Sequence, residues 1–521
     1  MKNSSILVLF SFLLSFNIYG QYTVITTENK LKEDANGYMG IVSLKNQSFA
    51  TIQQTKKFQL LINKYETSGK IISSNIIDNE ASLKSKLKFI DIISLGDKTF
   101  LMFEERIKEN HSRDYFAQAF NIESNTPIGD LKKITSEKCI ERGTFNSLEY
   151  SFNSLMSPIL FNTFYKNLYI LKNSPDSSKL LLGYNFKTEF TTKTANPNGK
   201  KDGRLYINVY DSKMNTIWEE ELIFEHDNYL QIFDLQITND GKIIVLAKGN
   251  YQSPIKLFIF QKDTRTVSLE VENNKKKVEV VDGKILSLKN GSYSAVGAYS
   301  YNEKPAGFYS SSFLSNQSSS VNIALNDFPK STFTEDTCKN IYLRNILSTS
   351  DNGYSLVYEK YERRESINQS QSTSGGVDTH SGGGQIIEQF GNVYVLKTDM
   401  EGKIAFIIDI PKLQYGARST ISQTTVRSIN CFSNNNQINI IFRDNIKNLT
   451  DNKADWKKEY EMGRFAYFAA ISVDSKGEFS KFNLGKEDDL LPNIKLDDLF
   501  KIGNAIYYIG KNNQVLSIQI K

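Results

Sequence analysis

Proline, cysteine and histidine are scarce in this chain of 521 residues, which has nine prolines, three cysteines and three histidines. A string of β-sandwich domains would need proline- or glycine-rich linkers at intervals of about 100 residues, and so few prolines argue against it. Cys139, Cys338 and Cys431 lie far apart, with no C-x-x-C spacing and no histidine near them in sequence, so a zinc site is not predicted. One disulfide with one thiol left over has three possible pairings, and buried free thiols are the expectation we favour.

Catalytic signatures are also absent. The sequence has no GxSxG, GxxxxGK[ST], HExxH or GxGxxG motif and no DxDxDG calcium loop. His111, His226 and His380 are scattered among turns and loops, where we expect solvated side chains rather than acids, bases or ligands. The sequence therefore predicts no catalytic, cofactor-binding or metal-binding residue and no cofactor, and it favours a protein that is not an enzyme.

Neighbouring carboxylates occur, but not in the arrangement that glycoside hydrolysis needs. They form three groups: Glu104-Glu105, Glu219-Glu220-Glu221, and Asp488-Asp489 with Asp497-Asp498. Consecutive side chains of a strand point to opposite faces, whereas a glycosidase needs two carboxyl groups roughly 5–10 Å apart across a cleft. We interpret all of these residues as surface charges.

Charges of the two signs are nearly balanced, with 63 basic and 58 acidic side chains. They are interspersed along the chain, and the Lys275-Lys276-Lys277 run is interpreted as a solvated turn. A nucleic-acid-binding surface would need basic residues gathered on one face. No nucleic-acid partner is predicted.

The first twenty residues have the features of a secretory signal peptide. Lys2 gives a positive start, Ile6–Phe16 is an apolar core too short to span a bilayer, and Gly20 is a small residue before Gln21. A buried N-terminal helix is the alternative. No cysteine follows the apolar core, so a lipid anchor is not expected, and no later apolar run approaches about 18 residues. We expect cleavage near Gly20 and a secreted, periplasmic or cell-surface protein without a membrane span.

Short apolar strands bounded by turns make up most of the remaining chain. Leu230–Val271 shows the pattern: four strands, with the first two joined by an Asp-Gly turn that supplies positive φ. A turn followed by an apolar strand occurs seven times, at Asp97, Asp176, Asp240, Asn290, Asp351, Asn435 and Gly503. A more charged hairpin follows most of these turns, as at Asp211, Asp399 and Asp474.

Four antiparallel strands in each unit of about 50–80 residues describe the blade of a β-propeller. We therefore predict an all-β fold with one propeller domain over 21–521 and seven four-stranded blades, with six or eight as the alternatives. The N- and C-terminal strands should close one blade, because closure protects sheet edges. In this scheme Leu499–Ile520 supplies inner strands and Phe58–Ile77 an outer hairpin of the closing blade.

Two segments interrupt the strand pattern. Ser136–Phe164 lacks clear alternation and is interpreted as an elaborated loop or short helix between blades. Ser366–Gln385 is polar and glycine-rich, so it is expected to be a disordered loop between the two hairpins of one blade. Both segments are candidates for partner contact. The 27 tyrosines and 33 phenylalanines fall mostly at strand positions, where core packing is expected rather than a carbohydrate-stacking surface.

One unit, Gly391–Gln414, carries a recognisable pattern. Its outer hairpin has an aromatic residue, a lysine, an Asp-x-x-Gly-Lys turn and a strand ending in Ile-Pro-Lys, which are Tyr394, Lys397, Asp399, Gly402, Lys403, Ile410, Pro411 and Lys412. This pattern resembles uncharacterised exported β-propeller-like proteins of Bacteroidota-type bacteria. Phe406 stands where tryptophan is common there, and Trp218 fills the comparable place of an earlier blade. The resemblance covers only this segment; it implies an exported propeller and carries no activity or functional residue.

These features favour an exported, non-catalytic binding or scaffold propeller at the cell envelope. It would recognise a protein or a glycan through its loops, as a monomer or as part of an envelope complex. The alternative is a propeller-type glycoside hydrolase or lyase whose residues converge at the mouth of the central channel. A purely structural role in an envelope assembly is the third possibility.

Overall fold

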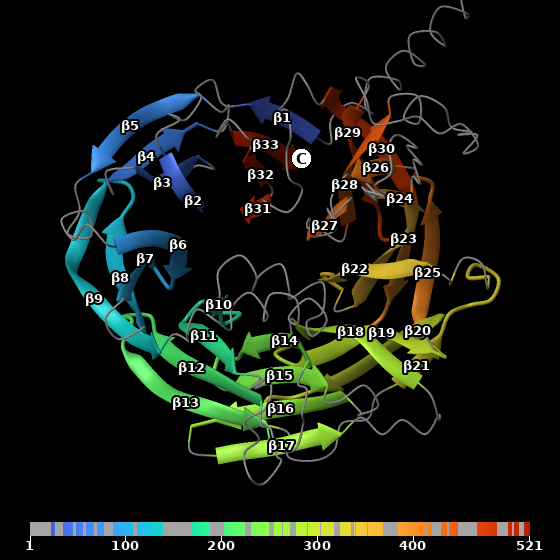
Figure 1. The fold of residues 1–521 in the computed structure, drawn as a ribbon, viewed down its shortest axis with the longest axis horizontal. Helices are drawn as coiled ribbons and strands as arrows, with labels where there is room; N and C mark the ends of the chain where they lie inside the picture. Colours follow the sequence, from blue (N-terminus) through green and yellow to red (C-terminus); the bar gives the residue numbers. More distant parts are fainter. Residues whose placement is uncertain are drawn as a thin grey trace, which may run out of the picture.

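The computed structural model describes residues 22–26, 35–77, 87–138, 169–187, 203–224, 231–248, 255–270, 278–316, 324–367, 384–418, 429–445, 466–486 and 499–520, apart from gaps of a few residues within these ranges. Its strands form eight antiparallel sheets, seven of four strands and one of five. Figure 1 shows them arranged as a ring around a central axis, with one edge strand of each sheet innermost. The predicted all-β propeller is therefore confirmed.

The eight sheets are called blades 1 to 8 in their order around the ring. Blade 1 consists of β31 (Leu499–Ile502), β32 (Ala505–Ile509), β33 (Val515–Ile520) and β1 (Tyr22–Thr26). Blade 2 consists of β2 (Ala35–Ser43), β3 (Phe49–Thr55), β4 (Leu60–Tyr65) and β5 (Ile71–Ile77). Blade 3 consists of β6 (Leu87–Leu95), β7 (Lys98–Ile107), β8 (Ser112–Asn121) and β9 (Thr126–Lys138). Blade 4 consists of β10 (Tyr169–Asn173), β11 (Lys179–Lys187), β12 (Gly203–Asp211) and β13 (Thr216–Phe224).

Blades 5 to 8 complete the ring. Blade 5 consists of β14 (Gln231–Ile237), β15 (Ile243–Lys248), β16 (Ile255–Gln261) and β17 (Thr264–Glu270), and blade 6 of β18 (Val278–Ser287), β19 (Tyr293–Tyr301), β20 (Lys304–Phe313) and β21 (Ala324–Asp327). Blade 7 consists of β22 (Ile341–Ser348), β23 (Tyr354–Ile367), β24 (Gly384–Thr398) and β25 (Ile404–Ile410), with β26 (Gln414–Arg418) as a fifth strand. Blade 8 consists of β27 (Ile429–Asn434), β28 (Gln437–Asn445), β29 (Ala466–Val473) and β30 (Phe479–Lys486).

The described strands form eight blades, one more than the preferred seven and equal to one of the alternatives. Each of the seven predicted inner turns does join the first two strands of a blade. The missed turn belongs to blade 2, where the amide of Leu44 donates to the carbonyl of Ser48 (2.8 Å). The sequence from Leu44 to Ser48 contains Asn46 and Ser48 but no glycine, proline or aspartate, so it is a weaker turn signal than the other seven.

Blade 1 closes the ring with the two ends of the chain, as predicted, but the strand that does so was wrongly chosen. β1 pairs with β33, with Tyr22 opposite Ile520 and Thr26 opposite Leu516. Phe58–Ile77, the expected closing hairpin, instead contributes β4 and β5 to blade 2. β1, β4 and β5 are all short strands rich in apolar residues, so their sequence pattern alone does not show which of them joins blade 1.

Apolar side chains from neighbouring blades form the core. Six hydrophobic clusters each fill the space between two consecutive blades, from blades 2 and 3 round to blades 7 and 8. Between blades 4 and 5, for example, Leu181 and Val209 pack with Val245 and Phe258. Phe100, Phe103, Phe258 and Phe260 are all buried, so the predicted core role is confirmed for these aromatic residues.

A polar residue at a bulge on the inner strand recurs in four blades. Asp91, Asp234, Asp282 and Asn345 each follow a register shift, and each accepts a hydrogen bond from the amide of the next residue. Asp234 also accepts from the amide of Ile285 in blade 6 (2.8 Å), and Asn345 donates to the carbonyl of Cys431 in blade 8 (2.9 Å). These bonds tie neighbouring inner strands together.

The cysteines agree in part with the expectation of buried free thiols. Cys431 is a buried free thiol and Cys338 a half-buried one. Burial raises the pKa of the Cys338 thiol, which makes it less reactive. Cys139 lies outside the residues that the structure describes.

An inner turn of blade 7 contains an ion pair that should make stability depend on pH. Lys397 donates to both carboxylate oxygens of Asp351 (2.8 and 3.0 Å). Burial alone would raise the pKa of Asp351, but hydrogen bonds from Lys397, Thr349 and Gly353 and the charge of Lys397 outweigh it and lower this pKa from 3.8 to about 2. Because the folded-state pKa is the lower one, the stabilisation is present above about pH 4 and is lost as the pH falls towards 2.

We expect Asp351→Asn to lower the melting temperature at pH 7 and to flatten its fall between pH 4 and pH 2.5, measured by thermal unfolding at a series of pH values. Lys397→Met should weaken the same pH dependence, because it takes away the charge and one set of hydrogen bonds that lower the pKa of Asp351, whereas the hydrogen bonds from Thr349 and Gly353 remain. An unchanged acid limb in both variants would show that this pair is not its source.

Candidate functional site: the arm of blade 7

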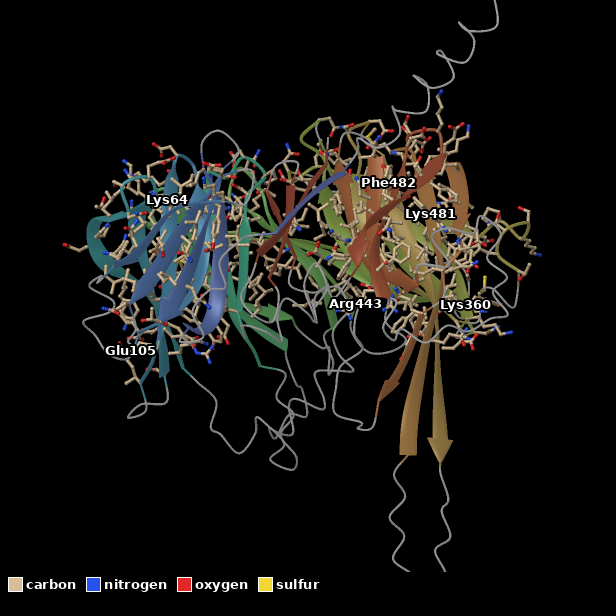
Figure 2. All side chains as sticks on the ribbon, turned by 90° about the horizontal axis from the view of Figure 1, so that it is seen from above. Lys64, Glu105, Lys360, Arg443, Lys481 and Phe482 are labelled. Atoms are coloured by element: carbon tan, nitrogen blue, oxygen red, sulfur yellow. The ribbon has the colours of Figure 1, made fainter. Side chains whose placement is uncertain are left out.

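Two strands of blade 7 continue beyond the ring. β23 and β24 have 14 and 15 residues and are the longest strands in the described part of the chain. Their outer halves, Tyr361–Ile367 and Gly384–Phe390, pair with each other, and β26 adds a third strand by pairing with Ile386–Phe390. We call these three segments the arm. Figure 2 shows them projecting from one face of the ring.

A bulge marks the point where the arm leaves the ring. Glu359 pairs with Val393, and the next pair in register is Tyr361 with Phe390, so the regular ladder is broken between them. The amide of Tyr361 donates to the carbonyl of Asn340 (2.7 Å), just before β22 begins. A bulge disrupts the ladder locally and increases the twist of its strand, so it separates the ladder of the ring from that of the arm.

Buried charges hold the base of the arm. Both carboxylate oxygens of Glu359 are engaged: Oε2 accepts from Nε of Arg344 (2.7 Å), and Oε1 forms an ion pair with Lys412. The side chains of Glu359 and Lys412 are 0% exposed and that of Arg344 is 14% exposed. Lys412 also donates to Gln414 (3.2 Å), whose amide donates to the carbonyl of Arg443 in blade 8. This root cluster therefore joins the arm, the segment after β25 and blade 8.

Aromatic rings enclose the two cations of the root cluster. The guanidinium of Arg344 lies 5.8 Å from the ring centroid of Tyr361 and 5.9 Å from that of Phe390. The ammonium of Lys412 lies 5.7 Å from the ring of Phe390 and 5.8 Å from that of Phe442. Such contacts stabilise a cation by about 0.5–2 kcal/mol each, most when water is excluded. They fix the direction in which the arm leaves the ring.

Blade 3 buries a glutamate at the equivalent position. Glu104 lies opposite Lys88 in the sheet, as Glu359 lies opposite Tyr342, and both precede the inner-strand bulge. Glu104 is 4% exposed and pairs with Lys88 and Arg113, each at 3.5 Å. The interpretation of Glu104 as a surface charge was therefore wrong, because one of two adjacent strand residues points inward.

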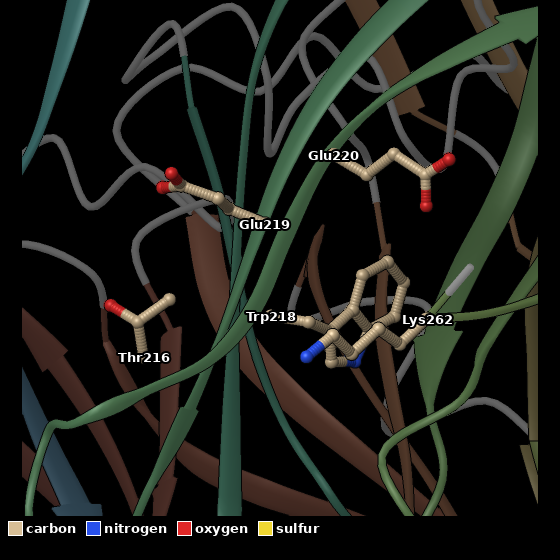
Figure 3. Close-up of a pocket in the computed structure, with 5 residues that line it drawn as sticks. All are labelled: Thr216, Trp218, Glu219, Glu220 and Lys262. Atoms are coloured by element: carbon tan, nitrogen blue, oxygen red, sulfur yellow. The ribbon is translucent and has the colours of Figure 1, made fainter.

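The other predicted carboxylate groups have different outcomes. Glu219 and Glu220 are exposed on β13, as expected. They line an open hollow of about 460 Å³ together with Thr216, Trp218 and Lys262 of the next blade. Figure 3 shows the two carboxylates pointing to opposite sides of the strand, so they do not converge on one ligand atom. Asp488, Asp489, Asp497 and Asp498 lie outside the described residues.

Trp218 in this hollow is a structural residue. Its indole is 6% exposed, and its Nε1 donates to the carbonyl of Gly241 in blade 5 (3.0 Å). It offers little surface for stacking a sugar. Trp218 pairs with Val209 and Phe406 with Lys397, each just before a register shift, so the predicted equivalence of these two positions is confirmed.

The residues of the Gly391–Gln414 pattern have structural roles. Tyr394 packs on Phe333, with ring centroids 5.2 Å apart. Lys397 pairs with Asp351, and Lys412 belongs to the root cluster. Gly402 has a φ of 85° at the turn that follows Asp399, a conformation that glycine adopts without strain.

Several sequence predictions concern residues that the structure leaves undescribed. They include His111, His226, His380, the Lys275 run, residues 139–164 of the first interrupting segment and residues 368–383 of the second. Within the described ranges, no group of three or more His, Cys, Asp or Glu side chains is arranged to hold a metal ion. No helix in those ranges has the length and hydropathy needed to cross a bilayer.

A ring of four-stranded antiparallel sheets closed by its two terminal strands defines a β-propeller. No protein-family model matches the chain, and no curated protein matches it. Similar solved structures include the β-propeller domain of Nup133 from Vanderwaltozyma polyspora, with a TM-score of 0.39, 9% identity, and coverage of 83% of this chain and 100% of that one. The β-propeller domain of the Trilobed protease from Pyrococcus furiosus has a TM-score of 0.37 and 10% identity, with coverage of 89% of this chain and 99% of that one. A protein of unknown function from Dyadobacter fermentans has a TM-score of 0.30 and 8% identity, with coverage of 96% of this chain and 99% of that one.

Proposed function

We propose that this protein is an exported binding propeller that recognises a protein of the cell envelope through the arm of blade 7. The arm is the single observation that carries the proposal. A propeller leaves only short edges at the rims of its blades, whereas the arm carries two further edges away from the ring. In the described sheet, β26 pairs with β24 alone. β22 begins at Ile341, opposite Lys360 of β23, and β23 continues beyond this point.

Open edges of this kind bind extended polypeptide segments by strand addition. Main-chain hydrogen bonds give such binding its affinity, and a rigid edge loses less conformational entropy on binding than a flexible loop does. The root cluster supplies that rigidity, because Glu359 is held by Arg344 and Lys412 in a buried site. The signal-like segment with Lys2, Ile6–Phe16 and Gly20 supports export.

The same contacts favour binding over the glycosidase alternative. A glycosidase needs two carboxyl groups across one cleft. Glu104 and Glu359, the two buried glutamates of the described residues, each face two cations inside their own blades. Their strands, β7 and β23, lie on opposite sides of the ring in Figure 1. Neither glutamate has the other as a partner for acid–base chemistry.

The arm can be removed at a defined register. Glu362 lies directly opposite Gln389, so residues 363–388 can be replaced by Asn-Gly, a sequence suited to a two-residue hairpin turn. In intact cells, a photoreactive residue at position 362 should give a discrete adduct with one envelope protein. The same residue at Ile217, exposed on β13 of blade 4, is the matched control.

The purified adduct partner should bind the full chain and lose at least tenfold in affinity for the arm-less variant. Equal adducts at positions 362 and 217, or unchanged affinity without the arm, would contradict the proposed recognition. N-terminal sequencing of the mature protein tests export separately, with Gln21 as the expected first residue.

A further inference from the structure

The outermost strand of blade 2 lacks the charges that protect most edges of this propeller. Edge strands usually carry charged residues that prevent pairing with another chain. Of the eight outermost strands, six contain at least one charged residue, namely β9, β13, β17, β21, β25 and β30. β1 and β5 contain none. β5 is the longer of these two, with the sequence IISSNII over Ile71–Ile77.

β5 also presents an apolar stripe to solvent. Ile72 and Ile76 are 56% and 53% exposed, the two highest values among the large hydrophobic side chains of the described residues. Together with Ser74 they lie on one face of the strand, because strand side chains alternate. All three are exposed, whereas Asn63 and Leu61, which lie opposite Ser74 and Ile76 in β4, are buried. On this face of blade 2, the β4 residues are therefore buried and the β5 residues next to them are exposed.

The sequence of β5 is nearly the same in both directions about Ser74. Ile71 corresponds to Ile77, Ile72 to Ile76, and Ser73 to Asn75. If two copies pair antiparallel around a two-fold axis at Ser74, Ile72 of each copy lies opposite Ile76 of the other, and the two serines face each other. Each exposed isoleucine then meets an isoleucine, the kind of cross-strand apolar pair that stabilises a sheet.

We propose that two copies of this chain associate through antiparallel pairing of their β5 strands, which joins blade 2 of one copy to blade 2 of the other as one eight-stranded sheet. A two-fold homodimer requires a strand whose sequence is complementary to itself about one residue, as that of β5 is. Binding of an unrelated peptide would not require this symmetry in β5. β5 lies on the outer rim of blade 2, across the ring from blade 7 (Figure 1), so the arm of each copy stays accessible.

The first experiment measures the mass of the full mature chain in solution. Pairing through one strand buries a small interface, so the wild type is examined at concentrations up to about 100 µM, by sedimentation equilibrium. We expect the mass of two chains for the wild type and of one chain for Ser74→Lys, which places two ammonium groups opposite each other. Ile217→Lys, a charge placed on an exposed isoleucine of another outermost strand, should leave the dimer unchanged.

The second experiment tests the register. Ser74→Cys places two thiols opposite each other at the two-fold axis, so mild oxidation should convert most of the protein into a disulfide-linked dimer. Ile217→Cys and the wild type, oxidised in parallel, should not form one. A single-chain mass for the wild type throughout the concentration range, a dimer that survives Ser74→Lys, or equal cross-linking of the two cysteine variants would each overturn the proposal.

Discussion

Replacing Glu359 by alanine is expected to lower the free energy of unfolding by about 3–5 kcal/mol, the range found when one partner of a buried ion pair is removed. The substitution takes away the carboxylate on which Arg344 and Lys412 converge. The Lys412 side chain is 0% exposed, so water cannot replace the lost partner without opening the contact between blade 7 and blade 8. The effect is large because a buried charge is left without its counter-charge.

Glu362 provides a matched control three residues along the same strand. Its carboxylate lies 3.5 Å from the ammonium of Lys360, and the two side chains are 23% and 36% exposed. An ion pair this accessible contributes about 0–1 kcal/mol. Urea unfolding of Glu359→Ala and Glu362→Ala, followed in parallel by fluorescence and circular dichroism, should therefore separate the two variants clearly. A difference below about 1 kcal/mol between them would contradict the assigned role of Glu359.

A triple replacement tests the cause of the loss. Changing Arg344, Glu359 and Lys412 together to apolar residues of similar length removes all three charges, whereas Glu359→Ala leaves the two cations without their counter-charge. Apolar replacements of buried ion pairs are often neutral or stabilising, so the triple variant should recover most of the stability that Glu359→Ala loses. If it is as unstable as the single variant, shape rather than charge sets the effect.

The root cluster also shows how far the sequence can predict this molecule. Arg344, Glu359 and Lys412 come from three separate segments and meet only because the blade folds. Sequence spacing does not report such a contact. One signal was present: the second strands of blades 3 and 7, TFLMFEE and YSLVYEKY, both place a glutamate after a run of apolar residues. A charge at a repeated position in otherwise buried strands indicates a buried pair.

The turns were easier to predict than the edges of the blades. Turns rich in glycine, asparagine and aspartate have conformational preferences that can be recognised in the sequence, and such turns located seven of the eight blades in the described residues. The blade 2 turn and the closing strand β1 are marked less clearly. Several apolar strands could occupy these sheet edges, and packing in the complete ring determines which of them does.

A second large effect is expected from Gly297→Ala in β19. Gly297 lies between Gly283 of β18 and Tyr309 of β20 in the sheet. A Cβ at Gly297 would lie 2.0 Å from the carbonyl oxygen of Asp282 and 2.5 Å from the Tyr309 ring. Tyr309 is 0% exposed and packed between blades 5 and 6, so it has no room to move away. We expect a loss of about 3–5 kcal/mol, more than the usual cost of overpacking a core, because a backbone carbonyl as well as a fixed side chain occupies the space.

Gly183 is the matched control, because it and Gly297 are each the fifth residue of the second strand of a blade. At Gly183 the nearest atom to an added Cβ is a Leu205 methyl carbon at 3.7 Å, an ordinary contact. Gly183→Ala should be neutral or stabilising by up to about 1 kcal/mol, since it removes backbone freedom from the unfolded chain. Tyr309→Phe should not rescue Gly297→Ala, because the contact with the Asp282 carbonyl persists. Equal melting temperatures for the two alanine variants would show that the Gly297 backbone adjusts, and that this column of Gly283, Gly297 and Tyr309 is not rigid.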